Sequence, residues 1–489
     1  IDIELYKIPL DDKKVFEMLS QGDSTGVFQL ESTGIRKIMK RLKPNKLEDI
    51  VALLALYRPG PLQSGMVDDF INRKNGKEKI EYPHKNLEII LKETYGVILY
   101  QEQVMKIASY MANYSLGEAD LLRRAMGKKN FAIMRENREK FIQRAVENNY
   151  TEEKADEIFE LIDKFAGYGF NKSHSVAYAM ISYWTAYLKA HYPAFYFAAI
   201  MTSEISETGD VAYYFNDAKE HRISIYPPNV NTPSAYFEIK NDGISYSLAA
   251  IKNLGLNLAK KIVEDYEKHG TYTKLDEFVL RNKKNGMNKR ALEALILSGA
   301  LDELEGNRKE KFLSIDKVLD FVSKAPKTDE IQQMNLFGAA SKTINKFALT
   351  NSEDFNLDEK LTKEKEFLGF YLSSHPLDKY KDIVTVFSIN KLSEIDVEES
   401  KVIKTFGTIT GLKKVLTKKD EQMALFSILC YDRIISCIAF PKTYDKFLEE
   451  IIEKKTVYIE GKIQIDEYKG EKTIKLLVEK IISLDKLYD

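Results

Sequence analysis

The chain has 489 residues, of which 44% are hydrophobic and 11% aromatic, enough for roughly two to four packed domains and too apolar for a disordered chain. Its 73 basic and 74 acidic residues give a net charge of −1, which excludes a uniformly basic nucleic-acid binder, so any such surface must come from local clusters. The only cysteines, Cys430 and Cys437, exclude a disulfide framework or a zinc site and fit a reducing compartment, and no run of residues is typical of a signal peptide or membrane span.

Residues 1 to about 225 are predicted to be mostly helical. The chain opens on Ile1, without an initiator Met, inside a segment that looks ordered, and we expect it to be a piece of a longer protein. Ser115-Leu-Gly-Glu118 has the form of a capping box, and the prolines from Arg58 to Pro61 and at Pro193 interrupt the pattern. Apolar residues recur at helical spacing in 12–20, 33–43, 46–57, 101–113, 117–127, 131–148, 152–166 and 174–190.

Two clusters of positive charge lie in this region. Residues 33–46 hold no acid and six bases: Arg36, Lys37, Lys40, Arg41, Lys43 and Lys46. Residues 121–145 hold eight bases against Glu136 and Glu139: Arg123, Arg124, Lys128, Lys129, Arg135, Arg138, Lys140 and Arg144. A run of charges is usually a solvated helix face, so a phosphate site and a plain solvated face both remain open.

The helix predicted over 117–127 carries the more suggestive of these bases. Arg124 and Lys128 are four residues apart and share a face, Gly127 ends the helix, and Leu121, Leu122, Ala125 and Met126 are expected to be its buried side. Arginine forks bind phosphate in a bidentate manner. Adjacent pairs of Arg and Lys at one helix end therefore favour phosphate, with an amphipathic helix as the alternative.

A glycine-containing loop, Phe165-Ala-Gly-Tyr-Gly-Phe-Asn-Lys-Ser-His-Ser175, leads into a long apolar helix. The N-terminus of a helix attracts anions through its free N–H groups and its dipole. Because Lys172 and His174 add positive charge there, the segment can form a triphosphate site. The alternative is an ordinary capped helix in which Ser173 or Ser175 satisfies the backbone.

A stiff connector over Tyr226–Pro233 is expected to separate a second domain over 226–380. A hairpin of strands 235–239 and 244–249 follows, and then Ile251-Lys-Asn-Leu-Gly-Leu-Asn-Leu-Ala-Lys-Lys-Ile262 resembles a helix-hairpin-helix. That motif offers backbone N–H groups to a DNA phosphate without reading bases. Asn257 stands where a second glycine is usual, and we expect it to take a left-handed conformation. A weaker second copy covers 288–299, and a plain helical hairpin is the alternative.

Residues 324–362 are predicted to be irregular and flexible, before a last helix and turn over 363–380. Within them Gln333-Met-Asn-Leu-Phe337 fits the pentapeptide that binds sliding clamps, because exposed Leu and Phe need a partner pocket.

The third domain, 385–489, shows the strand order of an OB-fold, with a helix over 443–454. Tyr431 and Phe440 are candidates for stacking on bases, although packing in the barrel is expected for at least one. The five strands are predicted over 402–410, 423–430, 433–439, 456–463 and 472–478.

Few acids are arranged for catalysis. Phosphoryl transfer by two metal ions needs paired carboxylates at strand ends, and the nearest candidates are Asp2, Glu4, Asp11, Asp12, Asp68 and Asp69. No strand pair frames them, so caps and surface acids are the expected roles. No P-loop, metal cluster of His and Cys, or G-x-S-x-G elbow is present.

Taken together, these segments closely resemble the bacterial DNA polymerase III alpha subunit, the C-family replicative polymerase of the DnaE type. The resemblance covers essentially the whole chain and implies a multidomain α+β fold: fingers over 1–225, a clamp-binding domain with a helix-hairpin-helix at about 251–300, and an OB barrel. The matching stretches are Ile8–Asp12, Gly26–Ser32, Tyr57–Met66, Gly96–Met105, Leu122–Lys129 and Phe165–Ser175.

The resemblance also implies roles for particular residues. The incoming dNTP would contact Arg123, Arg124, Lys128, Asn171, Lys172, Ser173 and His174, with Arg58 and Gln101 to Gln103 lining the pocket. Primer-template DNA would contact Lys129, Lys252, Gly255, Asn257, Lys260 and Lys261. The sliding clamp (beta) would bind Gln333, Leu336 and Phe337.

The family's palm, with the aspartates that bind Mg²⁺, is expected before Ile1, so no residue here is predicted to be catalytic or to bind metal. The fragment alone is expected to be inactive, while the parent would be a DNA-directed DNA polymerase in the bacterial cytoplasm, working with the other holoenzyme subunits and no membrane. Two alternatives stay open: a non-catalytic DNA-binding scaffold, and a self-sufficient nuclease using Asp11, Asp12, Asp68 or Asp69.

Overall fold

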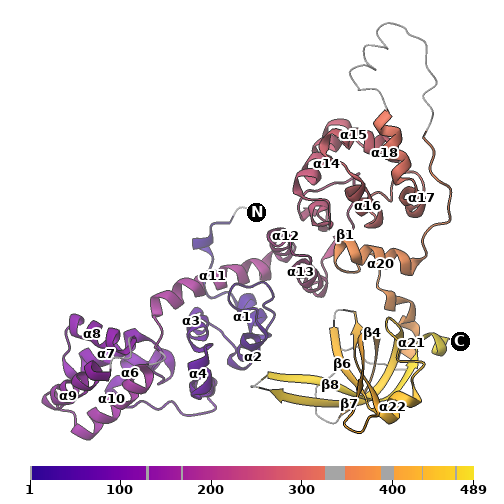
Figure 1. Cartoon of the computed structure of the whole chain (residues 1–489). Coiled ribbons are helices and arrows are strands. Elements are labelled where there is room, and N and C mark those ends of the chain that lie inside the picture. Colours follow the sequence, from indigo (N-terminus) through magenta and orange to yellow (C-terminus); the bar gives the residue numbers. More distant parts are fainter. Residues whose placement is uncertain are drawn as a thin grey trace. The chain divides into compact units, whose positions relative to one another are not determined.

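The computed structural model describes residues 3–127, 131–166, 169–324, 347–386, 401–431, 433–468 and 471–488. Contacts divide the chain into two compact units (Figure 1). Unit 1 comprises Ile1–Ser203 and Asp217–Ile223, and unit 2 comprises Glu204–Asn216 and Ser224–Asp489. The division into three domains stays a prediction. Within the described parts of the chain, no helix is both long and apolar enough to cross a membrane.

Unit 1 is built from helices, and most of the predicted ones are present within a residue or two. Its short 3₁₀ turns are Leu5–Lys7, Lys85–Leu87 and Lys92–Thr94. Its α-helices are α1 (Lys13–Ser20), α2 (Thr33–Leu42), α3 (Leu47–Leu56), α4 (Pro59–Gln63), α5 (Met66–Lys74), α6 (Glu88–Leu91), α7 (Gln101–Ala112), α8 (Leu116–Gly127), α9 (Phe131–Glu147), α10 (Glu152–Ala166), α11 (Lys172–His191), α12 (Pro193–Ser203) and the end of α13 (Thr208–Glu220).

The first hydrophobic core of unit 1 is formed by residues of α1, α2, α3, α5 and α11. Helix α3 lies directly against α11, and α11 presents Ala179, Ala186 and Ala190 to this core. Their small side chains let α3 approach closely, and the buried Tyr183 donates its hydroxyl to the carbonyl of Pro9. The predicted apolar helix is thus the central element of this core.

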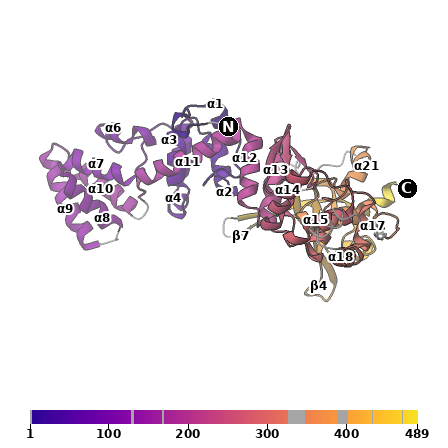
Figure 2. The same ribbon diagram turned by 90° about the horizontal axis from the view of Figure 1, so that it is seen from above.

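The second core of unit 1 lies among α7, α8, α9 and α10, which form a cluster of their own (Figure 2). The predicted capping box is confirmed, since the Glu118 carboxylate accepts from Ser115 N at 2.9 Å and Ser115 Oγ accepts from Glu118 N at 3.3 Å. Leu122 is buried as expected, whereas Leu121 is 62% exposed. The prediction for Leu121 was wrong because one position along a helix turns a side chain by about 100°.

A buried lysine joins three segments of unit 1. The ammonium group of Lys189, whose side chain is fully buried, lies 2.7 Å from Asp23 Oδ1, 2.7 Å from Asp217 Oδ2 and 3.2 Å from the carbonyl of Thr25. His221 adds a contact of 2.9 Å to Asp23 Oδ2. Burial alone would raise the pKa of Asp23, but the bonds to His221 and Lys189 lower it to about 2. The network fixes the C-terminal turn of α11 against the loop after α1 and against α13.

Unit 2 begins with a small sheet and continues with helices. Strand β3 (Gly243–Ser245) pairs antiparallel with β2 (Glu238–Lys240), as the hairpin prediction required, and parallel with β1 (Ser224–Tyr226). The parallel strand β1 was not predicted; its three residues lie at the predicted boundary between the first domain and the connector. The following elements are η4 (Leu248–Ala250), α14 (Leu256–His269), α15 (Leu275–Asn282), η5 (Lys283–Asn285), α16 (Lys289–Leu297), α17 (Arg308–Leu313), α18 (Ile315–Lys324), α20 (Leu357–Leu368), η6 (Pro376–Tyr380) and α21 (Lys381–Val386).

The helix predicted over 363–380 begins earlier than expected. Helix α20 starts at Leu357, and its cap Asn356 forms a capping box with Glu359. The polar residues that suggested an irregular segment are partly helix caps, which look like loop residues in a sequence. The clamp motif 333–337 and Lys128 and Lys129 lie outside the described residues.

The C-terminal part of unit 2 is a closed barrel with strand order β4-β5-β6-β8-β7. This confirms the predicted five strands and the OB order, with β6 parallel to β8 and all other neighbours antiparallel. The predicted helix between the third and fourth strands is present but shorter, because α22 ends at Lys446. The elements are β4 (Val402–Leu416), β5 (Gln422–Cys430), β6 (Arg433–Ala439), α22 (Pro441–Lys446), β7 (Thr456–Tyr468), β8 (Glu471–Ser483) and α23 (Asp485–Tyr488).

The Lys189 network yields a test of stability. Lys189→Met removes the charge that compensates Asp23 and Asp217, and removing one partner of a buried ion pair costs about 3 kcal/mol. We expect urea denaturation to show that loss. Lys164→Met, which breaks an exposed pair with Glu160 on α10, is the control and should change the free energy of unfolding by less than about 1 kcal/mol. Equal effects of the two variants would contradict the role assigned to Lys189.

Candidate nucleotide and DNA interface

The loop before α11 ends in a helix cap, but the capping residue is Asn171. Its Oδ1 accepts from the backbone N–H of His174 at 2.8 Å. Ser175 is instead fully buried and donates to the carbonyl of Val51 at 2.6 Å, while Ser173 is exposed. The segment is thus a capped helix, as in the alternative interpretation, but its cap is Asn171 and not Ser173 or Ser175.

Acidic side chains occupy the predicted anion site at the N-terminus of α11. The Glu102 carboxylate accepts from the backbone N–H of Lys172 at 3.0 and 3.1 Å and from Asn171 Nδ2 at 3.0 Å. The Lys172 ammonium group lies 2.6 Å from Glu93 Oε2. The site therefore attracts negative charge, as expected from the helix dipole, and in this structure two carboxylates of the chain itself supply that charge.

Residues far apart in the sequence meet around Phe170. The Arg58 guanidinium lies 4.3 Å from the centre of the Phe170 ring, and burial lowers the pKa of Arg58. Backbone Gln101 N donates to Phe170 O at 2.9 Å, and the Arg123 guanidinium donates to Gln101 Oε1 at 3.4 Å. The His174 ring lies 5.6 Å from that of Phe170. The structure thus brings together four of the predicted nucleotide-pocket residues, which we name the Phe170 cluster: Arg58, Gln101, Arg123 and His174.

Gln103 does not belong to the pocket as predicted. Its side chain is buried, accepts from the backbone N–H groups of Leu99 and Tyr100, and donates to Thr94 Oγ1 at 2.8 Å. It is a structural residue in the first turn of α7, where its side chain accepts from the N-cap backbone. The family resemblance had implied that Gln103 lines the pocket.

The basic side chains of α8 share one carboxylate. Asp120 lies 2.8 Å from Arg123 and 2.7 Å from Arg124. Arg124 is the more accessible, with 64% of its side chain exposed against 31% for Arg123. Asp120 was missed in the sequence, although its spacing of three and four residues from the two arginines is the signal for such pairs.

The bases of α9 pair within the helix cluster. Arg138 forms two bonds to Asp156, at 2.7 and 2.8 Å, while Lys140 and Arg144 both contact Glu118, at 2.7 and 3.1 Å. These hydrogen bonds hold the pKa of Glu118 well below its ordinary range. For these three bases the structure favours the solvated helix face over phosphate.

The helix-hairpin-helix turn differs from the expected backbone. The left-handed residues are Asn253, with φ 72°, and Gly255, with φ 73°, whereas Asn257 lies inside α14. The left-handed conformation predicted for Asn257 was therefore wrong. The helical part before the turn is only the 3₁₀ turn η4. The predicted DNA contacts are nevertheless all exposed at the start of α14 or just before it: Lys252, Gly255, Asn257, Lys260 and Lys261.

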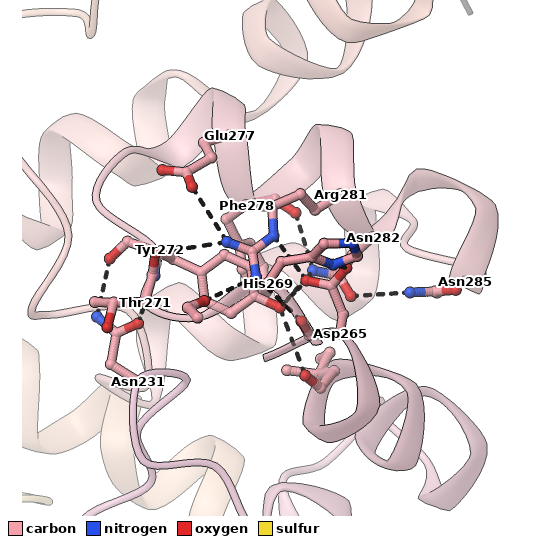
Figure 3. Close-up of polar contacts among 12 residues, drawn as sticks. Asn231, Asp265, His269, Thr271, Tyr272, Glu277, Phe278, Arg281, Asn282 and Asn285 are labelled. Atoms are coloured by element: carbon pink, nitrogen blue, oxygen red, sulfur yellow. Dashed lines mark hydrogen bonds and ion pairs between the residues drawn. The ribbon is translucent and has the colours of Figure 1, made fainter. Parts of the chain in front are cut away.

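A polar network behind this turn holds α14 and α15 together (Figure 3). Arg281 lies 2.8 Å from Asp265 Oδ2, donates to the carbonyl of Gly270 at 2.8 Å and stacks 3.8 Å from the centre of the Tyr272 ring. Tyr272 also donates its hydroxyl to Asp265 at 2.6 Å. Burial would raise the pKa of Asp265, but the bonds to Tyr272 and Arg281 lower it. The sequence gave no hint of this network because its members are joined only by tertiary packing.

On the barrel, the two aromatic candidates differ. The Tyr431 ring packs 4.7 Å from His375 and 6.1 Å from Phe406, and burial raises the pKa of Tyr431 to about 12. Phe440 is 48% exposed. Packing is thus confirmed for one of the pair, and only Phe440 keeps an accessible ring.

No metal site suited to phosphoryl transfer is found among the described residues. Asp23, Asp217 and His221 form a group that could in principle bind a cation, but the Lys189 ammonium lies 2.7 Å from both carboxylates and already neutralises them. Of the nuclease candidates, Asp12 caps α1 and lies 3.0 Å from His191, while Asp68 pairs with Arg41. These contacts favour structural roles for Asp12 and Asp68.

Two family models match parts of the chain. The model for the "Bacterial DNA polymerase III alpha subunit finger domain" matches residues 1–149, and the model for a helix-hairpin-helix motif matches residues 222–311. A finger domain followed by such a motif defines the chain as part of a DNA polymerase. More particularly, the chain belongs to the family of bacterial DNA polymerase III alpha subunits.

Similarity to individual members extends beyond the two matched regions. The chain is 43% identical over 486 residues to DNA polymerase III subunit alpha of Aquifex aeolicus, 38% over 491 residues to that of Borreliella burgdorferi, and 37% over 493 residues to that of Escherichia coli strain K12. Each alignment covers 99% of this chain but only 40% to 42% of the relative. The chain therefore spans about two fifths of the length of these relatives.

The geometry of the turn yields a prediction. Gly255 has φ 73° and ψ 152°, a region that side-chain-bearing residues rarely adopt, so Gly255→Ala should lower the free energy of unfolding by about 1–3 kcal/mol. Urea denaturation measures this. Gly117→Ala on α8, where an added Cβ also meets open space but the backbone is helical, is the control and should be neutral or slightly stabilising. A harmless Gly255→Ala would rule out the strained turn.

Proposed function

We propose that this chain is the part of a replicative DNA polymerase that grips the incoming dNTP, holds primer-template DNA and tethers the enzyme to its sliding clamp. The activity of the whole polymerase, DNA-templated nucleotidyl transfer in the bacterial cytoplasm with other holoenzyme subunits, is part of this proposal. The observation that carries it is the Phe170 cluster, which brings two guanidinium groups, those of Arg58 and Arg123, beside the loop that leads into α11, in a chain of this polymerase family.

The proposed nucleotide site works by electrostatic complementarity. Arg123 and Arg124 would bind phosphate oxygens through their guanidinium groups, and Lys172 would add a third positive charge. Asn171, Ser173 and His174 would line the N-terminal end of α11. Lys128, which follows Arg124 by four residues in the sequence, would contact the same triphosphate. Glu102 occupies the N–H groups of that end, so the triphosphate would have to displace it, and the displacement would reduce the net gain of binding.

Mg²⁺ is the metal that such a transfer uses, and when bound it neutralises charge on the phosphates. The described carboxylates of this chain do not fit it, since the one group close enough is occupied by Lys189. We propose that residues outside this sequence bind the metal and that the chain by itself does not extend a primer. Lys129, Lys252, Gly255, Asn257, Lys260 and Lys261 would hold the DNA through its backbone, and Phe440 would stack on single-stranded template.

Two opposite substitutions test the nucleotide site. Arg124→Ala removes an exposed guanidinium and should weaken dNTP binding by the chain about 10-fold, as expected for one charge-assisted hydrogen bond. Glu102→Gln removes the carboxylate charge that competes with the triphosphate, and it should strengthen dNTP binding by a few fold. Isothermal titration calorimetry with a dNTP in the presence of primed DNA measures both changes in dNTP affinity. Arg135→Ala, which removes an exposed guanidinium on α9, is the control.

The same experiment separates the alternatives. In a polymerase finger domain, added dNTP should tighten the binding of primed DNA, whereas a DNA-binding scaffold should show no such dependence. If Arg124→Ala and Glu102→Gln both leave dNTP binding unchanged, the proposed nucleotide site is wrong. Metal-dependent cleavage of the DNA would instead favour the nuclease.

The clamp tether is tested separately. A tether raises processivity through effective concentration rather than through catalysis. Leu336→Ala with Phe337→Ala should therefore abolish binding of a bacterial sliding clamp and leave the unfolding curve unchanged, because apolar anchors dominate such peptide contacts. Surface plasmon resonance on an immobilised clamp measures this, with Leu349→Ala as the matched control. Retained clamp affinity in the double variant would discard the motif.

A further inference from the structure

A basic hollow lies in unit 1, away from the residues discussed above. The C-terminal ends of α2 and α5 pack together and enclose a volume of about 400 Å³. We call this the α2–α5 hollow. Its lining residues are Lys40, Arg41, Lys43, Ile71, Asn72, Asn75 and Lys77.

Positive charge dominates the lining, which contains no acid. Arg41 is paired with Asp68, and the nearby Lys74 is buried against Asp49, 3.3 Å away, so neither charge is free. Lys40, Lys43 and Lys77 are exposed. Within the described part of the chain no carboxylate pairs with any of the three. A chain with a net charge of −1 thus keeps three uncompensated ammonium groups at one concave place.

The backbone around the hollow is arranged so that it does not repel an anion. The C-terminal carbonyls of a helix normally carry partial negative charge. Here Asn75 Nδ2 donates to the carbonyl of Arg41 at 2.9 Å, and Lys74 Nζ donates to that of Lys43 at 2.9 Å. These donors offset the negative end of α2 where it meets the hollow.

One of the three lysines is also held in place. Gly22 has φ 71°, and a Cβ added to it would lie 2.7 Å from Cε of Lys40 and 3.2 Å from its Cγ. The stem of Lys40 therefore lies close to the Gly22 backbone, where the positive φ also favours glycine. A restrained stem loses less conformational entropy when its ammonium group binds a ligand.

We propose that the α2–α5 hollow binds phosphodiester groups of the DNA backbone, as a contact separate from the Phe170 cluster and from α14. A protein partner would need an apolar or aromatic anchor, yet the only apolar lining residue, Ile71, is 3% exposed. Ammonium and amide groups suit phosphate oxygens and read no bases. The inference rests on the proposed function only in taking DNA as the ligand.

The test is the salt dependence of DNA binding. The triple variant Lys40→Gln, Lys43→Gln, Lys77→Gln is compared with the unmodified chain in fluorescence anisotropy on a primed duplex with a single-stranded overhang. Each lost phosphate contact lowers the slope of log affinity against log salt concentration by about 0.9, so a decrease of about 2 to 3 and a loss of affinity on the order of 10-fold are expected.

The control variant removes the same charge elsewhere in unit 1: Lys13→Gln, Lys14→Gln and Lys106→Gln, all exposed. It should leave the slope nearly unchanged. If the triple variant does not fold, the three single variants replace it, each with a slope change of about 1.

The outcomes separate this inference from the proposed function. An unchanged slope in a triple variant whose unmodified parent binds DNA overturns the α2–α5 hollow alone. Absence of DNA binding by the unmodified chain overturns both. Calorimetric titration with inorganic pyrophosphate tests whether the hollow binds a free phosphate instead of DNA. If the triple variant loses pyrophosphate binding but keeps its DNA affinity, the hollow binds a free phosphate and the proposal is overturned.

Discussion

The buried ammonium group of Lys189 is the interaction on which unit 1 depends. Burying this ammonium group costs free energy, and the contacts with Asp23, Asp217 and the carbonyl of Thr25 offset that cost. By fixing the last turn of α11, it fixes a rigid helix of 20 residues, about 30 Å long. The other end of that helix carries Asn171 and Lys172. The position of the proposed nucleotide site thus depends in part on packing at the opposite end of α11.

Carboxylates of the chain itself would compete with phosphate for the basic side chains. Most of the basic side chains that suggested phosphate contacts have an acidic neighbour in the folded chain: Asp120 for Arg123 and Arg124, Glu93 for Lys172, and Glu118 for Arg144. The pairs of Glu118 with Arg144 and of Glu93 with Lys172 join separate elements, whereas Asp120 pairs with its arginines inside α8. They also set an electrostatic cost for binding, because an incoming phosphate must be preferred over a carboxylate that is already in place.

Helix periodicity explains why much of the fold could be predicted. The apolar spacing located α7, α8, α9, α10 and α11 almost to the residue, and the alternation of the last hundred residues gave the five strands of the barrel. Both signals are local, since a side chain at a given position faces one side of a helix or strand whatever the rest of the chain does. Strand β1 was missed because three residues are too few to show an alternating pattern, and the start of α20 was missed because helix caps look like loop residues.

The candidate site was predictable in its residue types and less so in its geometry. The sequence indicated Arg58, Gln101, Arg123 and His174, and the fold brings them together around Phe170. It did not indicate Glu102 as the group on the N-terminus of α11, nor Gln103 as a buried structural residue. The contact between Glu102 and the N-terminus of α11 joins segments that are about 70 residues apart in the chain. A local sequence pattern cannot predict such a contact.

The sequence by itself determined the order of helices and strands, the family of the chain and the composition of its charged segments. Only the tertiary structure decided which charges remain uncompensated. Lys40, Lys43 and Arg41 look alike in the sequence, yet folding pairs Arg41 with Asp68 and leaves the two lysines facing the α2–α5 hollow. The physical reason is that an ion pair depends on a distance of a few ångströms between side chains, and that distance is set by how the helices pack.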